Sequence, residues 1–385
     1  MSITYSHIFI LQFGLVHKYN MSKLINNGAF CVLPFIHRYQ RQTGAEHFCC
    51  YANDIPVDHT DKNKITELKK KIYNGEKISN CDRCYKAEEQ GMVSPRIRES
   101  LRWLEQDIEA LEYIESWTEK SEDKILSYDL RYDNKCNLAC IMCGPASSTM
   151  WAKELNVEAE PKVFKYKFED VIKAKKIYMA GGEPFLIDTF VNLINAISKL
   201  DVQPELVINT NLTRVNDELK ETLRNIKKLT LAVSVDAYES VNEYHRWPMK
   251  WDKLIDNLKW AHSIGCNLQL TSAVDAISIL NMDQLRSIED LVNSWALIIV
   301  HFPKDLMVEN LPNRLKQFAY DNFINMKKSK FYTTDVNFKG DVDNILHKIM
   351  QEGNTKLLQE KIKGIDERRQ LNHEDYLGVN LLYPE

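Results

Sequence analysis

The chain has 385 residues, of which 44% are hydrophobic and 27% charged, and its formal net charge is −4 at pH 7. This length allows one large domain and a smaller one, and the apolar fraction is sufficient for a packed core. Because the chain has no basic excess, its composition does not suggest nonspecific nucleic-acid binding through phosphates. Five of the nine cysteines stand in C-x-x-C or C-x-x-x-C-x-x-C spacing, which is typical of thiolates that bind metal in a reducing compartment. We therefore expect a cytoplasmic protein.

The first apolar run of the chain is too short to span a bilayer. Residues 8–16 read IFILQFGLV, and they lack the basic segment and the cleavage site of a secretion signal. Met21 offers an alternative start of translation. We therefore predict that residues 1–20 are an extension outside the fold, and we predict no membrane segment.

Residues 21–100 contain four cysteines that are expected to form one closed metal site. They are Cys31 and Cys49, in C-x12-G-x4-C spacing, and Cys81 and Cys84, in C-x-x-C spacing. Four thiolates are the ligand set of a closed iron-sulfur cluster or of a structural zinc ion. The spacing does not decide between the two metals. Cys50 is a spare or substitute ligand, and Cys266 is most simply a core residue.

Strands and helices alternate along most of the remaining chain. Apolar residues at helical spacing predict one amphipathic connecting helix in residues 101–123, packing on the domain that follows. Residues 303–385 are charged and helical and form a predicted helical tail. The helical segments between the strands favour parallel strands joined by crossovers. Six strands are predicted in residues 124–302, at 126–132, 176–180, 206–209, 229–235, 268–273 and 296–302.

Three cysteines follow the first of these strands in a single short loop. Cys136, Cys140 and Cys143 stand as C-N-L-A-C-I-M-C. Three thiolates can hold a [4Fe-4S] cluster by three corners and leave one iron open to a further ligand. The alternatives are a zinc site with a fourth ligand elsewhere, or core cysteines at chance spacing.

The sequence K-C-N-L-A-C-I-M-C-G resembles the CxxxCxxC loop of the radical S-adenosylmethionine (SAM) superfamily. In that superfamily the open iron chelates the amino and carboxylate groups of SAM, and reduction cleaves SAM to a 5'-deoxyadenosyl radical. The resemblance implies an α/β fold, a partial (β/α)6 barrel with its cofactor loops at the C-terminal ends of the strands. It also implies an electron donor such as flavodoxin or ferredoxin.

The second predicted strand is followed by Gly181, Gly182 and Glu183, which resemble the GGE sequence of the superfamily. The resemblance implies that Glu183 binds the amino group of SAM, while the glycines allow a close approach of the backbone. Outside this context a Gly-Gly-Glu turn is more often simply a turn.

Polar residues also end the third and fourth predicted strands, and an arginine follows. By the same resemblance these side chains would hold the ribose and carboxylate of SAM. The alternative roles are turn formation, helix capping and a surface ion pair. Adenine contacts stay unassigned, because the fifth strand lacks a glycine-rich pattern. The residues are Asn209, Asn211, Ser234, Asp236 and Arg246.

The cysteine set of residues 21–100 resembles the auxiliary-cluster pattern of SPASM and twitch domains. The stretches C-V-L-P-F-I-H, C-C-Y and C-x-x-C-Y-K-A-E-E-Q-G-M-V-S-P-R further resemble radical SAM proteins with an N-terminal twitch domain. The resemblance spans Phe30 to about Leu311. It implies an auxiliary [4Fe-4S] cluster held by Cys31, Cys49, Cys81 and Cys84.

The predicted organisation is therefore an extension (1–20), a small twitch-like domain (21–100), a connecting helix (101–123), a radical SAM partial barrel (124–302) and a helical C-terminal region (303–385). The predicted activity is hydrogen abstraction from a peptide or protein substrate by the deoxyadenosyl radical. No catalytic acid, base or hydrogen donor can be assigned. The alternative function is a noncatalytic metal-binding scaffold, with zinc or iron-sulfur, or an electron carrier.

Overall fold

The computed structural model of the protein describes residues 24–41, 44–53, 56–89, 91, 93–158 and 164–383. The chain divides into two compact units, each described separately below. Unit 1 comprises Met1–Tyr132 and Phe164–Ile177, and unit 2 comprises Asp133–Val163 and Tyr178–Glu385. The predicted extension at 1–20 and the alternative start at Met21 lie outside the described residues.

Unit 1 contains a small group of strands beside a helical core. Strand β1 (His37–Gln40) pairs antiparallel with β2 (Glu46–His47) and parallel with β3 (Ser127–Leu130), whose residue Tyr128 lies opposite Arg38. Neither β1 nor β2 is among the predicted strands. The helices of unit 1 are α2 (Leu33–Ile36), α3 (Lys62–Tyr73), η1 (Ser79–Cys81), α4 (Asp82–Glu89), α5 (Pro95–Gln106), α6 (Ile108–Glu115) and α8 (Phe168–Val171).

The predicted connecting helix is in fact two helices, α5 and α6, which meet at Asp107. The Asp107 side chain accepts a hydrogen bond from the backbone N–H of Ala110, so this residue caps the start of α6 and ends α5. The apolar residues Leu104, Leu111 and Ile114 are buried in the core of unit 1 itself. The prediction of one helix packed on the following domain was therefore wrong, because an N-cap interrupts the helical spacing.

Unit 2 is an α/β unit built on parallel strands, and it confirms the strand predictions. Strands β5 (Glu205–Thr210), β6 (Leu229–Ser234), β7 (Asn267–Val274) and β8 (Ser294–Ile299) lie side by side in that order, each parallel to the next. Strand β4 (Lys176–Met179) begins in unit 1 and ends in unit 2. With β3, these five strands match the six predicted segments.

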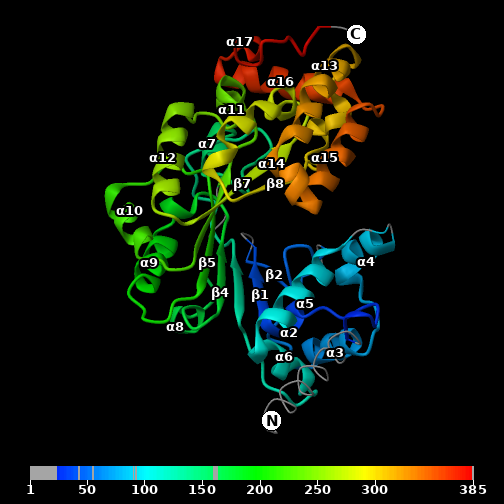
Figure 1. Ribbon diagram of the computed structural model, residues 1–385, viewed down its shortest axis with the longest axis vertical. Coiled ribbons are helices and arrows are strands. Elements are labelled where there is room, and N and C mark those ends of the chain that lie inside the picture. The colour runs from blue at the N-terminus through cyan, green and yellow to red at the C-terminus, as the bar shows by residue number, and fades with distance from the viewer. Residues whose placement is uncertain are drawn as a thin grey trace, which may run out of the picture. The chain divides into compact units, whose positions relative to one another are not determined.

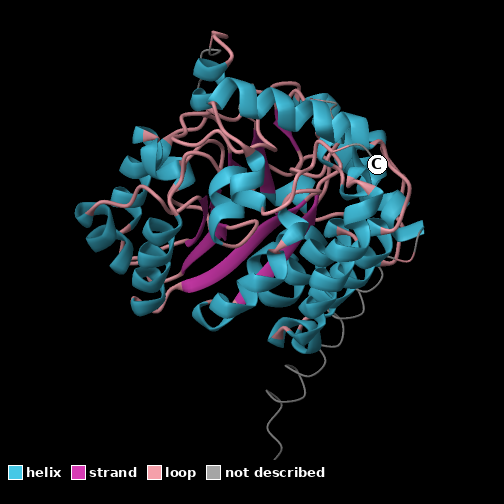
Figure 2. Ribbon diagram, turned by 90° about the horizontal axis from the view of Figure 1, so that it is seen from above, coloured by secondary structure: helices cyan, strands magenta, loops and turns pink. Residues whose placement is uncertain are grey.

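Helices flank the strands of unit 2 (Figures 1 and 2). In Figure 1, α9, α10 and α12 lie along one side of the strands, and α15 lies beside β8, where the rings of Trp295 and Phe338 are 5.5 Å apart. The helices preceding β8 are α7 (Thr149–Glu154), η2 (Pro184–Leu186), α9 (Asp188–Ile197), α10 (Asp217–Arg224), α11 (Glu239–His245), α12 (Trp251–Ser263), η3 (Ser278–Leu280) and η4 (Met282–Leu291).

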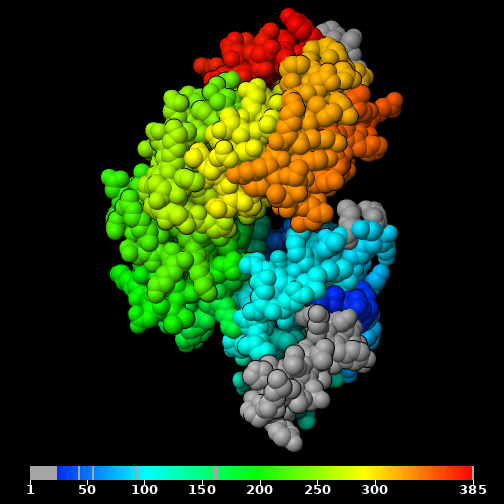
Figure 3. Space-filling view, in the orientation of Figure 1, coloured from blue at the N-terminus to red at the C-terminus, as the bar shows by residue number. Residues whose placement is uncertain are grey.

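The region after β8 is helical, as predicted, and it belongs to unit 2. Its residues, coloured orange to red in Figure 3, pack directly against the yellow and green residues of the same unit. None of the described helices is both long and apolar enough to cross a bilayer. The helices of this region are η5 (Lys304–Leu306), η6 (Val308–Asn310), α13 (Asn313–Phe323), η7 (Ile324–Lys328), α14 (Lys330–Thr334), α15 (Val336–Ile349), α16 (Thr355–Arg369) and α17 (His373–Leu377).

Candidate active site

A cavity of about 230 Å³ opens at the C-terminal ends of the parallel strands of unit 2. Ligand sites of α/β sheets and barrels commonly lie at this edge, because the loops that follow parallel strands all emerge there. Ten of the eleven predicted site residues of unit 2 line this cavity. They are Cys136, Cys140, Cys143, Gly181, Gly182, Glu183, Asn209, Asn211, Ser234 and Arg246.

The cysteine loop is held in place through its backbone on both sides of Cys140. The N–H of Ala139 donates to the carbonyl oxygen of Trp247 at 2.7 Å, and the N–H of Ile141 donates to that of His245 at 2.9 Å. Through these two bonds the backbone at Arg246 lies opposite Cys140. The carbonyl oxygen of Cys140 itself accepts a bond of 2.7 Å from the indole Nε1 of Trp151. The loop is thus a bonded part of the fold with its thiols turned to the cavity.

The glycine pair lies directly against the start of the cysteine loop. The N–H of Gly182 donates to the carbonyl oxygen of Asp133 at 2.9 Å, and the N–H of Glu183 donates to that of Lys135 at 2.8 Å. A Cβ atom at Gly182 would lie 2.3 Å from the Lys135 oxygen, and Gly181 has a φ of 132°, which L-residues rarely adopt. Only glycines therefore allow these two loops to join into one wall of the cavity.

Glu183 is buried and already bound by its neighbours. Its Oε1 accepts hydrogen bonds from the hydroxyl of Thr210 at 2.6 Å and the N–H of Phe185 at 3.2 Å, and its Oε2 accepts one from the N–H of Asn211 at 2.7 Å. Burial raises the pKa of this carboxyl to about 7. Through these bonds Glu183, which follows β4, is connected to the end of β5. A carboxylate has about four acceptor sites, so one site remains for a donor in the cavity that Glu183 lines.

The polar residues at the ends of β5 and β6 form neutral hydrogen-bonded pairs. The hydroxyl of Ser234 donates to Oδ1 of Asn209 at 3.2 Å. The amide of Asn211 donates to Oδ1 of Asn137 at 3.1 Å, which joins the end of β5 to the cysteine loop. Amide and hydroxyl groups both donate and accept hydrogen bonds, as a hydroxyl-bearing ligand requires.

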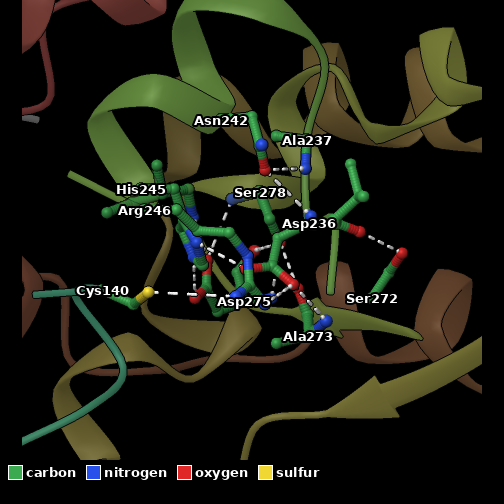
Figure 4. Close-up of polar contacts among 12 residues, drawn as sticks. Cys140, Asp236, Ala237, Asn242, His245, Arg246, Ser272, Ala273, Asp275 and Ser278 are labelled. Atoms are coloured by element: carbon green, nitrogen blue, oxygen red, sulfur yellow. Dashed lines mark hydrogen bonds and ion pairs between the residues drawn. The ribbon is translucent and has the colours of Figure 1, made fainter. Parts of the chain in front are cut away.

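Arg246 and Asp236 belong to a buried charge network (Figure 4). Arg246 lines the cavity, whereas Asp236 is not among the lining residues. Nε and Nη2 of Arg246 lie 2.6 and 2.9 Å from the two carboxylate oxygens of Asp236, so this side-on pair of donors is taken. Its Nη1 is directed to the sulfur of Cys140 at 3.8 Å. Asp236 was predicted to contact the cofactor, but its side chain is fully buried and pairs with Arg246.

The same network includes His245, which lies between two carboxylates. Its Nδ1 lies 2.9 Å from Asp236 Oδ2, and its Nε2 lies 2.6 Å from Asp275 Oδ2. Burial opposes a charged imidazole, but Asp275 and Asp236 outweigh it and raise the pKa of His245 to about 10. With Arg246 and His245 both charged, two cations balance two carboxylates, which satisfies the requirement that buried charges be paired.

The three thiols of the loop differ in acidity. A hydrogen bond from the Cys143 thiol, together with the nearby Arg246, outweighs burial and lowers the pKa of Cys140 to about 7. Burial raises the pKa of Cys136 to about 12, and the bond to Cys140 raises that of Cys143 well above its usual range. The thiolate is the metal-binding form, and the positive charge of Arg246 favours a thiolate at this pair of thiols.

The four predicted ligands of the second metal site lie together in unit 1. Burial raises the pKa of Cys31, and negative charge on Cys81, Cys49 and Cys84 would raise it further, so these four thiols lie within electrostatic range of one another. Cys50 has Asp129 as its strongest charged neighbour. The arrangement favours Cys49 over Cys50 as the ligand.

Both sets consist of free cysteines. Among the described residues, no group of three or more His, Cys, Asp or Glu side chains is arranged to hold a single metal ion. Thiolates that bind a cubic cluster bond to different irons, so they need not converge on one point.

Several residues that contribute to the cavity were not predicted. Thr271 and Ala273 of β7 line it, while Leu268, Leu270, Ser272 and Val274 of the same strand are buried. The alternation of the strand was a usable signal for these two. Thr210 stands between two predicted residues. His245 and Asp275 carried no sequence signal, because their pairing brings the end of α11 to the end of β7. Other unpredicted lining residues are Leu138, Met142, Ser147, Ser148 and Ile298.

A comparison with protein families matches residues 132–293 to the radical SAM superfamily. Among curated proteins, the chain is 24% identical over 102 residues to a GTP 3',8-cyclase of Clostridium botulinum (strain Okra / Type B1), covering 26% of this chain and 32% of the relative. The chain thus spans about a third of the length of the curated relatives it matches.

Two solved structures show similarity at low identity. One is Streptococcus suis SuiB bound to precursor peptide SuiA, with 15% identity, coverage of 62% of each chain and a TM-score of 0.38. The other is anSMEcpe with bound AdoMet, with 13% identity, coverage of 55% of this chain and 59% of that one, and a TM-score of 0.41. From the family match, this chain contains a radical SAM superfamily domain at residues 132–293, within which lie the cysteine loop, the glycine pair and most of the cavity.

Proposed function

We propose that this protein is a radical SAM enzyme that abstracts a hydrogen atom from a peptide or protein substrate. The observation that carries the proposal is the convergence on one cavity of three cysteines, a glycine pair and the polar ends of the strands. These groups come from separate loops, so their meeting is a property of the fold and not of any one stretch of sequence. The family match at residues 132–293 supports the same assignment.

The donor set fits the cofactors that this family implies. Cys136, Cys140 and Cys143 would hold a [4Fe-4S] cluster, and the positive charge of Arg246 beside Cys140 would favour its thiolate form. The contact of the glycine pair with the cysteine loop leaves backbone, without side chains, along one wall of the cavity. When bound and reduced, the cluster and SAM would supply a 5'-deoxyadenosyl radical for hydrogen abstraction.

The remaining cavity groups would bind and orient SAM. The free acceptor capacity of Glu183 suits the ammonium, and Asn209, Asn211 and Ser234 offer donors and acceptors for the ribose and carboxylate. Arg246 would act mainly as a fixed positive charge beside Cys140, because its side-on donors already bind Asp236. In this division of roles the protein supplies position and electrostatics, while the cofactors carry the radical chemistry.

The proposal also includes an auxiliary [4Fe-4S] cluster in unit 1, held by Cys31, Cys49, Cys81 and Cys84 in a twitch-like domain. A zinc ion held by the same four thiolates is the alternative. An electron donor such as flavodoxin or ferredoxin would reduce the enzyme, and both cysteine sets suit a cytoplasmic location. The peptide or protein substrate follows from the resemblance to twitch-bearing radical SAM proteins, and the GTP 3',8-cyclases among the relatives suggest GTP as a comparison substrate.

The test begins with anaerobic reconstitution of the full chain. We expect a brown protein that contains iron and that, once reduced, converts SAM to 5'-deoxyadenosine without any substrate. A noncatalytic zinc scaffold would instead be colourless, contain stoichiometric zinc and leave SAM intact. An iron-sulfur protein that exchanges electrons but does not cleave SAM would support the electron-carrier alternative.

Substrate class is tested separately. We expect a short peptide encoded beside this gene to accelerate 5'-deoxyadenosine formation above the uncoupled rate and to gain or lose mass. Acceleration by GTP, with no effect of the peptide, would contradict the peptide proposal while leaving the radical SAM assignment intact.

A further inference from the structure

Helix α16, in the C-terminal region of the chain, contacts the cysteine loop through one buried arginine. Nη2 of Arg369 donates to the carbonyl oxygen of Ala139 at 2.8 Å, and the Arg369 side chain is 1% exposed. Residue 369 lies beyond the segment that matches the radical SAM family, which ends at 293. A bond from this helix to the residue before Cys140 therefore links the cofactor loop to a part of the chain outside the family domain.

Arg369 is fixed by three further contacts. Its Nε lies 3.0 Å from Glu154 Oε2, and its guanidinium lies 4.8 Å from the ring of Trp151 and 5.0 Å from that of Trp247. A planar guanidinium can stack on aromatic rings and still donate in its own plane, which a lysine ammonium cannot do. The arginine is thus preorganised, so little freedom is lost when it holds the loop.

The aromatic residues around Arg369 also bind the backbone of the cysteine loop, at Ala139 and Cys140. Trp151 donates its indole N–H to the carbonyl oxygen of Cys140, and Trp247 accepts the N–H of Ala139 through its own carbonyl. Arg369 completes this set by binding the carbonyl of Ala139. The backbone N–H of Ala139 and the carbonyl oxygen of Cys140 are therefore bound by residues that also contact Arg369.

We propose that Arg369 is a positioning residue for the cysteine loop, so that α16 is a working part of the cofactor site without touching the cofactor. Loss of this bond frees the Ala139 carbonyl and removes the support between the two indoles. The loop then samples geometries in which the sulfur of Cys140 no longer has a fixed position. The consequence for cluster retention rests on the proposed function, whereas the consequence for loop mobility does not.

The neighbouring residue provides a matched control. Arg368 also binds Glu154, with its Nε 3.1 Å from Oε1, and also lies over Trp151, at 5.6 Å. Among the described residues, the hydrogen-bond and ion-pair partner of Arg368 is Glu154 and not the cysteine loop, and its side chain is 36% exposed. Arg369→Lys and Arg368→Lys therefore both keep the positive charge and affect the same helix and the same acidic partner, and they differ in the contact with Ala139.

The first measurement is hydrogen-deuterium exchange of the metal-free protein. We expect Arg369→Lys to raise the exchange rates of the amides in residues 139–143 by about tenfold or more, because a charge-assisted hydrogen bond is lost. Arg368→Lys should leave these rates close to wild type. Arg369→Gln, which keeps an amide donor but no charge, is made in parallel and should give an intermediate increase.

The second measurement is loss of iron to a chelator after anaerobic reconstitution. The SAM-binding cluster is identified as the one whose electron paramagnetic resonance signal changes when SAM is added. We expect Arg369→Lys to lose this cluster about 10- to 100-fold faster than wild type, as is typical when a residue supporting a metal ligand is altered. Melting temperature is recorded for every variant, because an equal increase of exchange throughout unit 2 would indicate a general loss of stability and overturn the inference. Equal loop exchange in wild type and both Arg369 variants would also overturn it.

The two proposals fail in different ways. A wild-type protein that takes up no iron would contradict the proposed function, while the exchange data would still decide the role of Arg369. Normal cluster retention and normal loop exchange in Arg369→Lys would contradict the positioning role alone.

Discussion

The two cysteine sets of this protein differ in whether their thiols line a cavity. In unit 2 the thiols face a cavity, the loop backbone is bound on both sides of Cys140, and a cation lies 3.8 Å from its sulfur. In unit 1, Cys31, Cys81 and Cys84 are buried within an apolar core, and burial is the leading cause of their raised pKa values. The comparison teaches that the spacing of cysteines along the chain does not by itself describe the surroundings of their thiols in the fold.

The physical consequence concerns the charge that each set must carry. Thiolates in an apolar core require a metal ion to compensate their charge, so metal binding there contributes directly to folding. The cysteine loop of unit 2 has Arg246 and a network of backbone bonds before any metal arrives. We therefore expect the unit 2 loop to keep its shape without metal, and a metal bound by the four cysteines of unit 1 to raise the stability of that unit.

The largest effect is expected for Cys140→Ala. This change removes one of three protein thiolates from the open cluster, so we expect the loss of about four irons of about eight and of all SAM cleavage. Iron analysis and 5'-deoxyadenosine assays on one anaerobic preparation would measure both. Cys266→Ala is the control, since Cys266 belongs to neither set, and it should keep both properties. Full SAM cleavage by Cys140→Ala would show that the loop is not the cofactor site.

Replacing both Cys81 and Cys84 with alanine tests the other set. If these residues hold an auxiliary cluster, uncoupled SAM cleavage should persist while substrate turnover falls by a factor of about 100 or more. A purely structural metal would instead lower the melting temperature and leave turnover per folded molecule nearly unchanged. Cys50→Ala is the matched control in the same unit. Loss of uncoupled SAM cleavage in a folded double variant that keeps about four irons would contradict the division of roles.

Gly182→Ala should affect unit 2 alone. Its new Cβ would meet the Lys135 carbonyl oxygen at 2.3 Å, so the glycine pair and the cysteine loop must separate, at a cost of about 1–3 kcal/mol in stability. We expect weaker SAM binding and lower iron content in the cysteine loop, measured by equilibrium binding and iron analysis.

Gly144→Ala is the matched control for this steric argument, because a Cβ there would have nothing within 4 Å. It also stands beside the cysteine loop but should retain SAM affinity. Similar losses in both variants would argue against steric separation of the loops as the cause.

The smallest effect is a pH dependence of stability through His245. The pKa of this histidine rises from 6.5 to about 10 in the folded protein, so its contribution is fully present below pH 6.5, declines above it and is lost as the pH passes about 10. We expect His245→Gln to lower the melting temperature more at about pH 6 than at about pH 10.5. The exposed His301 provides the control His301→Gln. A difference from wild type that does not change with pH would show that His245 is neutral in the folded state.

The secondary structure of unit 2 was largely predictable, whereas that of unit 1 was not. All six predicted strands exist, because runs of apolar residues between helical segments report burial directly. Strand β2 has two residues, which are too few to show a pattern, and the four residues of β1 read HRYQ and contain no aliphatic side chain that would indicate a buried strand. The connecting helix was predicted as continuous because Asp107 acts through a local cap that helical spacing does not reveal.

The candidate site shows the same division. Ten predicted residues line the cavity, because the parallel arrangement brings the strand ends to one edge once the strands are known. Asp236 was expected at the cofactor but is buried against Arg246 and His245. His245 is the last residue of α11 and Arg246 follows it directly, so their meeting with Asp236 depends on how α11 packs against the end of β6.

The sequence by itself determined the residue types and the order in which they occur: two cysteine sets, a glycine pair and polar residues at strand ends. These follow from local patterns, whose physical causes act over a few residues. Only the tertiary structure decided that Arg246 lies beside Cys140 and that Arg369, 230 positions after Ala139, binds the loop between two indoles. Such contacts depend on the packing of distant segments, because a buried charge can be stable only where the whole fold provides its partners.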